Sequence, residues 1–83
     1  MSILVTGATG LLGSVLTRQL VEADADVRIF RRTTSLLDLL GDTSDRVEHA
    51  IGDVRDARSV ARAMDGIQHV YHTAAKIGFA SGD

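Results

Sequence analysis

The sequence predicts an α/β fold: the N-terminal part of a doubly wound parallel sheet with four strands and about three helices. Two observations support this. Short apolar, β-branched runs alternate with segments of helical periodicity, and a glycine-rich stretch, Thr6-Gly-Ala-Thr-Gly-Leu-Leu-Gly13, separates the first strand from the first helix. Such alternation implies right-handed crossovers between parallel strands. A chain of 83 residues forms at most one small domain.

The composition is that of an ordinary globular protein, and it argues against several functions. The chain has 45% hydrophobic and 24% charged residues and a formal net charge of -2, so no general affinity for nucleic acid is expected. It has no cysteine, which removes disulfides and thiolate catalysis and fits a cytoplasmic location. The run Ile3–Val5 is short and lacks a basic leader, so we expect neither a membrane span nor a signal peptide.

The first strand and the first helix flank the glycine stretch. Ile3–Val5 is expected to be a strand buried on both faces. From Leu11 onward, apolar residues recur at helical spacing, so we expect a helix that packs on the sheet through its apolar side. The expected inner residues are Leu11, Leu12, Val15, Leu16, Leu20 and Val21, and the expected outer residues are Ser14, Thr17, Arg18 and Glu22.

The rest of the chain continues the alternation. Three further strands are expected, at residues 27–30, 47–51 and 67–72. A short apolar helix over 36–40 is expected to end at Gly41, and a second amphipathic helix is expected between a capping Asp56 and Gly66. The apolar positions of this last helix are Ala57, Val60, Ala61 and Met64, with Arg55, Arg58 and Arg62 on its outer side.

Gly7, Gly10 and Gly13 predict a phosphate-binding turn because they lie between a strand and a helix. Gly7 permits the tight exit from the strand, Gly10 lets the backbone approach a pyrophosphate, and Gly13 allows close packing of the helix. The N–H groups of Leu11 and Leu12 would face the phosphates. No Gly-Lys-Ser/Thr follows, which excludes a Walker-type loop. The alternative is a glycine-rich turn that binds no ligand. That alternative does not explain Gly13, since a glycine inside a helix costs roughly 1 kcal/mol of stability relative to alanine.

Three motifs occur in order along the chain: the Thr6–Gly13 stretch, Gly52-Asp-Val-Arg-Asp56 and His72-Thr-Ala-Ala75. Together they resemble the start of an extended short-chain dehydrogenase/reductase of the epimerase/dehydratase and dihydroflavonol-reductase-like type. The resemblance implies that residues 1–83 are the N-terminal part of an NAD(P)-binding Rossmann domain in a longer enzyme, whose remaining domain and substrate region lie outside this chain. It also places the fourth strand beside the first, as an open apolar edge around Val70 and Tyr71.

The end of the second strand predicts which dinucleotide is bound. Sites of this type distinguish the two cofactors there, through an acid on the ribose 2'-OH of NAD or an arginine on the 2'-phosphate of NADP. The chain reads Phe30-Arg31-Arg32, without a carboxylate, so we expect NADP(H) to be preferred and NAD(H) to be the second option. In the family pattern Arg31 replaces the NAD-selecting acid and Arg32 matches a phosphate-binding arginine. The alternative is that both are solvated surface charges.

The resemblance implies further cofactor contacts. Asp53 would bond the adenine amino group, Val54 would pack against the ring, and residues 73–75 would run along the ribose. A turn or cap role for Asp53 and a plain loop at 73–75 remain the alternatives. The complete set of expected cofactor-binding residues is Gly7, Thr9, Gly10, Leu11, Leu12, Gly13, Arg31, Arg32, Asp53, Val54, Thr73, Ala74 and Ala75.

No catalytic or metal-binding residue is expected in this chain. The family uses a Ser or Thr and a Tyr-x-x-x-Lys pair well beyond the fourth strand. Tyr71 and Lys76 are not that pair, since they are five apart and Tyr71 lies in a strand. His49, His69 and His72 lack metal-ligand spacing and are expected to be packed or edge residues. His72 matches the family's His-x-Ala-Ala and is assigned an orienting part.

The expected function is therefore that of an oxidoreductase or epimerase acting by hydride transfer on a small-molecule carbonyl or alcohol. Alone, the chain is expected to bind the cofactor weakly and to be inactive. The alternative is a non-catalytic, NADP-sensing, NmrA-like regulatory protein; Leu11-Leu12 and His72–Ala75 favour the enzyme. We expect the full-length protein to be a homo-oligomer with a small-molecule substrate and to bind neither nucleic acid nor membrane.

Overall fold

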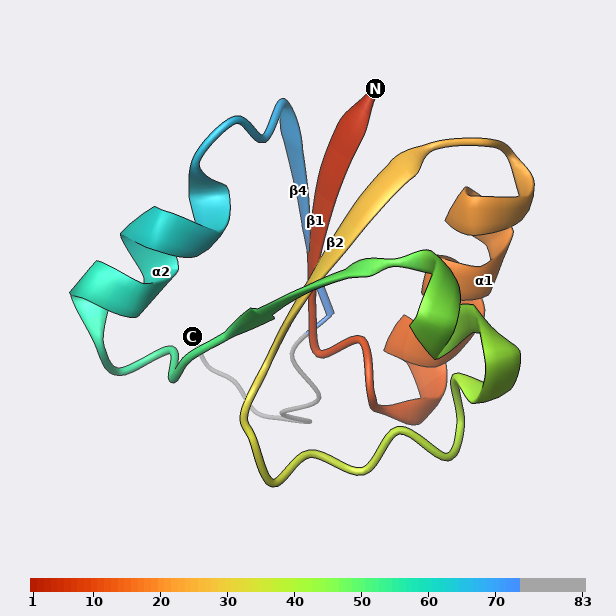
Figure 1. Cartoon of the computed structure of the whole chain (residues 1–83), viewed down its shortest axis with the longest axis horizontal. Helices are drawn as coiled ribbons and strands as arrows, with labels where there is room; N and C mark the ends of the chain where they lie inside the picture. Colours follow the sequence, from red (N-terminus) through yellow and green to blue (C-terminus); the bar gives the residue numbers. More distant parts are fainter. Residues whose placement is uncertain (74–83) are drawn as a thin grey trace.

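The computed structural model describes residues 1–73, which form a parallel sheet with helices on both faces (Figure 1). Within this range the strands are β1 (Ser2–Thr6), β2 (Asp26–Arg31), β3 (Glu48–Ile51) and β4 (His69–His72). The helices are α1 (Leu11–Glu22), the 3₁₀ helix η1 (Gly41–Arg46) and α2 (Ala57–Met64). The strand order is β3-β2-β1-β4 and each neighbouring pair is parallel, which confirms the predicted doubly wound α/β fold with β4 beside β1.

Different helices cover the two faces of the sheet, because successive side chains of a strand point to opposite faces. One core cluster lies against α1 and η1 and contains Ile3, Val5, Ala8, Val21, Val27, Ile29 and Leu40. The other lies against α2, where Leu4 and Phe30 contact Ala63. Figure 1 shows α1 and α2 on opposite sides of the strands. The sheet is thus buried on both faces at its centre, as the apolar run of β1 predicts.

Helix α1 contacts the sheet through small residues, which corrects the predicted inner face. Three expected inner residues are exposed: Leu11, Leu12 and Val15. Ser14 and Thr17, expected outside, are completely buried. Their hydroxyls are satisfied within the helix, since Ser14 Oγ donates to the Leu11 carbonyl (2.9 Å) and Thr17 Oγ1 to the Gly13 carbonyl (2.7 Å). The start of α1 lies close against the loop after β1, since a Cβ atom at Gly13 would be 2.7 Å from the Gly7 carbonyl carbon.

The segment 36–40 does not form the predicted helix. It makes a single turn, in which the N–H of Gly41 bonds the Leu37 carbonyl (3.3 Å), and η1 begins at Gly41 instead of a helix ending there. Leu40 is buried in the core and Leu37 packs against it half-buried, while Leu36 and Leu39 are exposed. The apolar run therefore contributes Leu37 and Leu40 to the packing of the core through a turn instead of through a helix.

Helix α2 begins where predicted but buries a different side. The Asp56 side chain accepts a hydrogen bond from the N–H of Arg58 (3.1 Å), which confirms the predicted cap. The buried residues are Ser59 and Ala63. Of the expected inner set, Val60 is half-buried, and the exposed members are Ala57, Ala61 and Met64. Small residues again lie closest to the sheet.

Strand β4 lies at one edge of the described sheet and, among residues 1–73, pairs with β1 alone. Val70 is 46% exposed and Tyr71 is 42% exposed, so the predicted open apolar edge is present in this part of the chain. No helix within residues 1–73 is both long enough and apolar enough to cross a membrane.

Candidate functional site

A hollow of about 330 Å³ lies at the carboxyl ends of the strands. Its lining residues are Thr6, Gly7, Thr9, Phe30, Arg31, Arg32, Ser35, Gly52, Val54 and His72. In open α/β sheets, ligands bind outside the carboxyl ends of the strands, where the strand order reverses. The order reverses here between β1 and β4, which both contribute to the lining. The hollow therefore occupies the position where this fold class places its ligands.

The loop between β1 and α1 requires glycine at two positions. Gly7 has φ +73°, and a Cβ atom there would lie 2.5 Å from the Thr73 carbonyl oxygen. A Cβ atom at Gly13 would lie 2.7 Å from the Gly7 carbonyl carbon and 2.7 Å from Thr73 Oγ1. The predicted roles of Gly7 in the strand exit and of Gly13 in close packing are thereby confirmed.

Gly10 and the start of α1 form the second part of this loop. Gly10 is the N-cap residue, and a Cβ atom there would have the Gly7 oxygen as its nearest neighbour, 3.5 Å away. The first backbone bond of the helix joins the Ser14 N–H to the Gly10 carbonyl (2.9 Å), so the N–H groups of Leu11 and Leu12 lack intrahelical partners. Within residues 1–73 no side chain caps this terminus, and its first turn holds no acid. The terminus carries partial positive charge and suits a phosphate.

Arg31 and Arg32 both line the hollow but are held differently. Arg31 Nε donates to His49 Nδ1 (2.8 Å), and Arg31 Nη1 donates to the Arg32 carbonyl (2.9 Å). The Arg32 side chain is 61% exposed, and its Nε lies 4.0 Å from Asp53 Oδ2. The sequence shows no carboxylate at the end of β2, whereas the fold brings Asp53 there from the loop after β3. Arg31 is therefore fixed in direction, while Arg32 has a loose ionic contact.

Asp53 has a turn role in this structure. Its Oδ1 accepts from the backbone N–H of Arg55 (2.9 Å) and from Arg55 Nε (3.1 Å), and its Oδ2 accepts from Arg55 Nη2 (2.7 Å). The hydrogen bonds from the Arg55 side chain and then from its backbone hold the pKa of Asp53 well below its usual value of 3.8, and the same pairing raises the pKa of Arg55. Arg55 was predicted only as an outward-facing residue, and the sequence has no signal for this pairing.

Some of the other expected site residues line the hollow, and some lie outside the described part of the chain. Thr9 and Val54 line the hollow, and Val54 is 60% exposed there, as an adenine-packing residue would be. His72 also lines it and shares a short hydrogen bond between its Nδ1 and Thr6 Oγ1. Thr73 Oγ1 donates to the Thr6 carbonyl (2.6 Å). The remaining residues named from the sequence lie outside the described residues: Ala74, Ala75 and Lys76.

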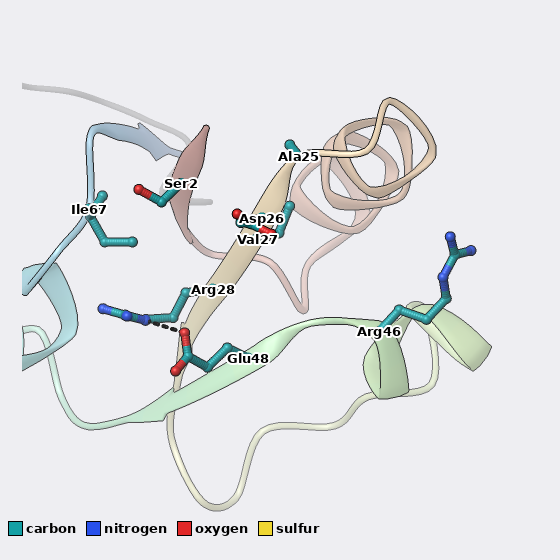
Figure 2. A pocket seen from close by; sticks show the side chains of 8 residues that line it. All are labelled: Ser2, Ala25, Asp26, Val27, Arg28, Arg46, Glu48 and Ile67. Atoms are coloured by element: carbon teal, nitrogen blue, oxygen red, sulfur yellow. Dashed lines mark hydrogen bonds and ion pairs between the residues drawn. The ribbon is translucent and has the colours of Figure 1, made fainter.

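A second hollow, of about 390 Å³, lies at the opposite ends of the strands (Figure 2). Its most polar side chain, Arg28, is occupied by structural bonds: Nε to Glu48 Oε1 (2.8 Å), and Nη1 to the carbonyls of Ala63 and Asp65 (both 2.7 Å). Arg46 points away from this pair in Figure 2. Arg28 thus joins β2 and β3 to the end of α2, so its guanidinium group holds the fold together at this hollow. Across residues 1–73, no three His, Asp or Glu side chains are grouped to hold a metal.

Known proteins resemble the chain over nearly its whole length. It is 45% identical over 83 residues to sterol demethylase protein B of Methylococcus capsulatus, covering 100% of this chain and 25% of that protein. It is 39% identical over 80 residues to 3 beta-hydroxysteroid dehydrogenase/Delta 5-->4-isomerase of Mycobacterium tuberculosis, covering 96% of this chain and 20% of the other. The crystal structure of Thermus thermophilus UDP-glucose 4-epimerase in complex with NAD superposes with a TM-score of 0.76 at 29% identity, covering 92% of this chain and 24% of that one.

The match is to one part of these proteins, since the chain spans between 20% and 25% of their lengths. Residues 3–81 match the NAD dependent epimerase/dehydratase family. That range contains the glycine loop, both arginines and the Asp53 turn, and the Thermus thermophilus structure shares the fold of this chain. This chain belongs to the NAD dependent epimerase/dehydratase family.

Proposed function

We propose that residues 1–83 form the NADP(H)-binding part of an oxidoreductase or epimerase that acts by hydride transfer on a small-molecule carbonyl or alcohol. One observation carries the proposal: the uncapped N-terminus of α1 and the guanidinium groups of Arg31 and Arg32 belong to one end of the sheet, around one hollow. The family membership supports a nicotinamide dinucleotide as the ligand.

The residues present suit the parts of such a dinucleotide. The pyrophosphate would lie over the N–H groups of Leu11 and Leu12, in the space that the absent side chain of Gly10 leaves open. Val54 offers an exposed apolar surface for the adenine ring. A bound nicotinamide would supply hydride donation or acceptance, and the described residues would hold and orient it. The groups that act on the substrate are expected outside this chain.

The preference for NADP(H) rests on charge at the end of β2. An NAD-selecting acid would accept from the ribose 2'-OH, whereas Arg31 occupies that sequence position here. A 2'-phosphate beside Arg31 and Arg32 would receive charge-assisted hydrogen bonds that a 2'-OH cannot match. Asp53 lies beside Arg32 but is itself bonded by Arg55, which offsets its repulsion of a phosphate.

The names of two relatives support a substrate class. One is a sterol demethylase protein and the other a 3 beta-hydroxysteroid dehydrogenase/isomerase. We therefore favour a hydroxylated or keto polycyclic substrate of the sterol type over a sugar nucleotide for the full-length protein. A homo-oligomer and a cytoplasmic location, which the lack of cysteine fits, complete the proposal.

Calorimetric titration of the intact protein with NADPH and with NADH tests the cofactor. We expect NADPH to bind about tenfold more tightly or better, which corresponds to one or two well-placed contacts with the 2'-phosphate. Equal or tighter binding of NADH would contradict the NADP(H) preference, and failure to bind either would contradict the dinucleotide site itself. Reduction of a ketosteroid by the NADPH complex would then distinguish an enzyme from the NADP-sensing alternative. A sensor would bind NADPH without reducing the ketosteroid.

A further inference from the structure

The direction of Arg31 is set by residues of two other elements. Paired residues of β2 and β3 place Ile29 opposite His49 and Arg31 opposite Ile51, so Arg31 and His49 are diagonal neighbours. Ile29 belongs to the core cluster on the α1 and η1 face, and side chains two residues apart share a face. His49 therefore lies between Arg31 and η1, whose Ser44 carbonyl is 2.7 Å from His49 Nε2.

The hydrogen bonds of His49 define its tautomer. A backbone carbonyl only accepts, so the contact with Ser44 requires the proton of a neutral ring on Nε2. The lone pair on Nδ1 is then free to accept from Arg31 Nε, at 2.8 Å. Both ring nitrogens are thereby hydrogen-bonded. A chain of two hydrogen bonds leads from the Ser44 carbonyl in η1, through His49 in β3, to Arg31 at the hollow.

These contacts leave part of the guanidinium group for a ligand. Of its five N–H donors, Nε–H bonds His49 and one Nη1–H bonds the Arg32 carbonyl, so three remain within the network of the described residues. They lie on a side chain that lines the hollow and whose rotation is restricted at both its Nε and Nη1 ends. A guanidinium group whose orientation is already restricted loses less conformational entropy on binding a phosphate than the guanidinium group of a free arginine side chain does.

We propose that His49 is a positioning residue for cofactor selection: it holds Arg31 with its free N–H groups toward the 2'-phosphate of NADP(H). The inference rests on the proposed function and adds to it a residue in β3 that need not contact the cofactor. Arg32, which has a loose ionic contact with Asp53 and no comparable fixed partner among residues 1–73, would adjust its position on binding.

The test compares His49→Phe with His49→Asn in the intact protein. Phenylalanine keeps a ring of similar size but has no acceptor for Arg31 Nε, whereas the amide oxygen of asparagine can take the place of Nδ1. We expect His49→Phe to reduce the ratio of NADPH to NADH affinity about tenfold with little change for NADH, and His49→Asn to restore most of the ratio. In an Arg31→Leu background, His49→Phe should change the ratio no further.

A second measurement needs no cofactor. Long-range ¹H–¹⁵N correlation spectra of the imidazole should show the Nε2–H tautomer of His49 in the wild-type protein, and the opposite tautomer would overturn the proposal. An equal loss of NADPH and NADH affinity in His49→Phe, or the same ratio change in the Arg31→Leu background, would also overturn it. If the wild type binds NADPH selectively and His49→Phe keeps the ratio, this inference alone fails. If the wild type binds neither dinucleotide, the proposed function fails with it.

Discussion

Gly13→Ala tests the geometry of the glycine loop because two effects of opposite sign compete there. Gly13 lies in the first turn of α1, and by helix propensity alone alanine should stabilise that helix by up to about 1 kcal/mol. The structure predicts the reverse. The added methyl group would lie 2.7 Å from the Gly7 carbonyl carbon and 2.7 Å from Thr73 Oγ1, far inside van der Waals contact.

The cost of this contact exceeds the gain in propensity. The contact with the Gly7 carbonyl is with backbone, so no change of rotamer relieves it. The loop is also held from the other side, because Thr73 Oγ1 and the Thr73 N–H both bond the Thr6 carbonyl. Inserting a methyl group into a packed site that must shift costs about 3 kcal/mol. Subtracting the gain of about 1 kcal/mol in propensity leaves a net destabilisation of about 2 kcal/mol.

Chemical denaturation of the intact protein measures this difference, with Gly10→Ala as the matched control. A Cβ atom at Gly10 has its nearest neighbour at 3.5 Å, and alanine as an N-cap in place of glycine costs at most about 1 kcal/mol. We expect Gly10→Ala to stay close to the wild type in stability while losing dinucleotide affinity, since its methyl group would occupy the pyrophosphate position. A Gly13→Ala protein as stable as the wild type, or more stable, would refute the packing argument.

Three further experiments test separate parts of the structure. In a fluorescence titration, Arg32→Ser should weaken the binding of NADPH about tenfold and leave the affinity for NADH nearly unchanged. An equal loss of affinity for both would mean that Arg32 does not contact the 2'-phosphate. Asp53 has a lowered pKa, so its contribution to stability is complete above the usual value of 3.8 and is lost as the pH falls below it. Asp53→Asn should therefore have a lower free energy of unfolding than the wild type near neutral pH, and this difference should narrow in acid. Denaturation curves over a pH series measure it. A difference that stays constant with pH would mean that the pairing with Arg55 is unimportant. Leu4→Ala should cost about 3 kcal/mol of unfolding free energy, whereas Leu11→Ala, at a residue 75% exposed, should change it by less than about 0.5 kcal/mol; similar losses at both would contradict the observed burial.

The order of the strands and of helices α1 and α2 was predictable from short apolar runs and helical periodicity, whereas the helix expected over 36–40 is a single turn followed by η1. The inner faces of the helices were not predictable. Hydrophobic periodicity assumes that the most apolar residues face the sheet, but in α1 the small residues Ser14 and Thr17 are buried, and Leu11 and Leu12 are exposed. Where two backbones lie close together, only small side chains fit between them, whatever their hydrophobicity. The sequence does not show the distance between the elements, so it does not show whether size or hydrophobicity decides which residues are buried.

The site was predictable to the extent that it depends on local sequence. The glycine spacing and the cap at Asp56 are local patterns, and the geometry confirms both. The partner of Arg31 is His49, 18 residues away, and it depends on the register of β2 with β3. A histidine without metal-ligand spacing has no sequence signal for such a role, so it was expected only to be a packed or edge residue.

The glycine loop itself depends on a distant part of the chain. Thr73 follows β4, and its bonds to the Thr6 carbonyl span 67 residues. The position of Thr73 limits the space at both Gly7 and Gly13, and the pairing of β4 with β1 places Thr73. The space around the loop Thr6–Gly13 is therefore limited from two sides, by the Gly7 carbonyl of the loop itself and by the residue that follows β4. Gly7 needs its positive φ and Gly13 its missing side chain even without Thr73, because the nearest atoms to a Cβ at Gly13 belong to the Gly7 carbonyl. Thr73 thus adds a second boundary to a loop that already requires both glycines.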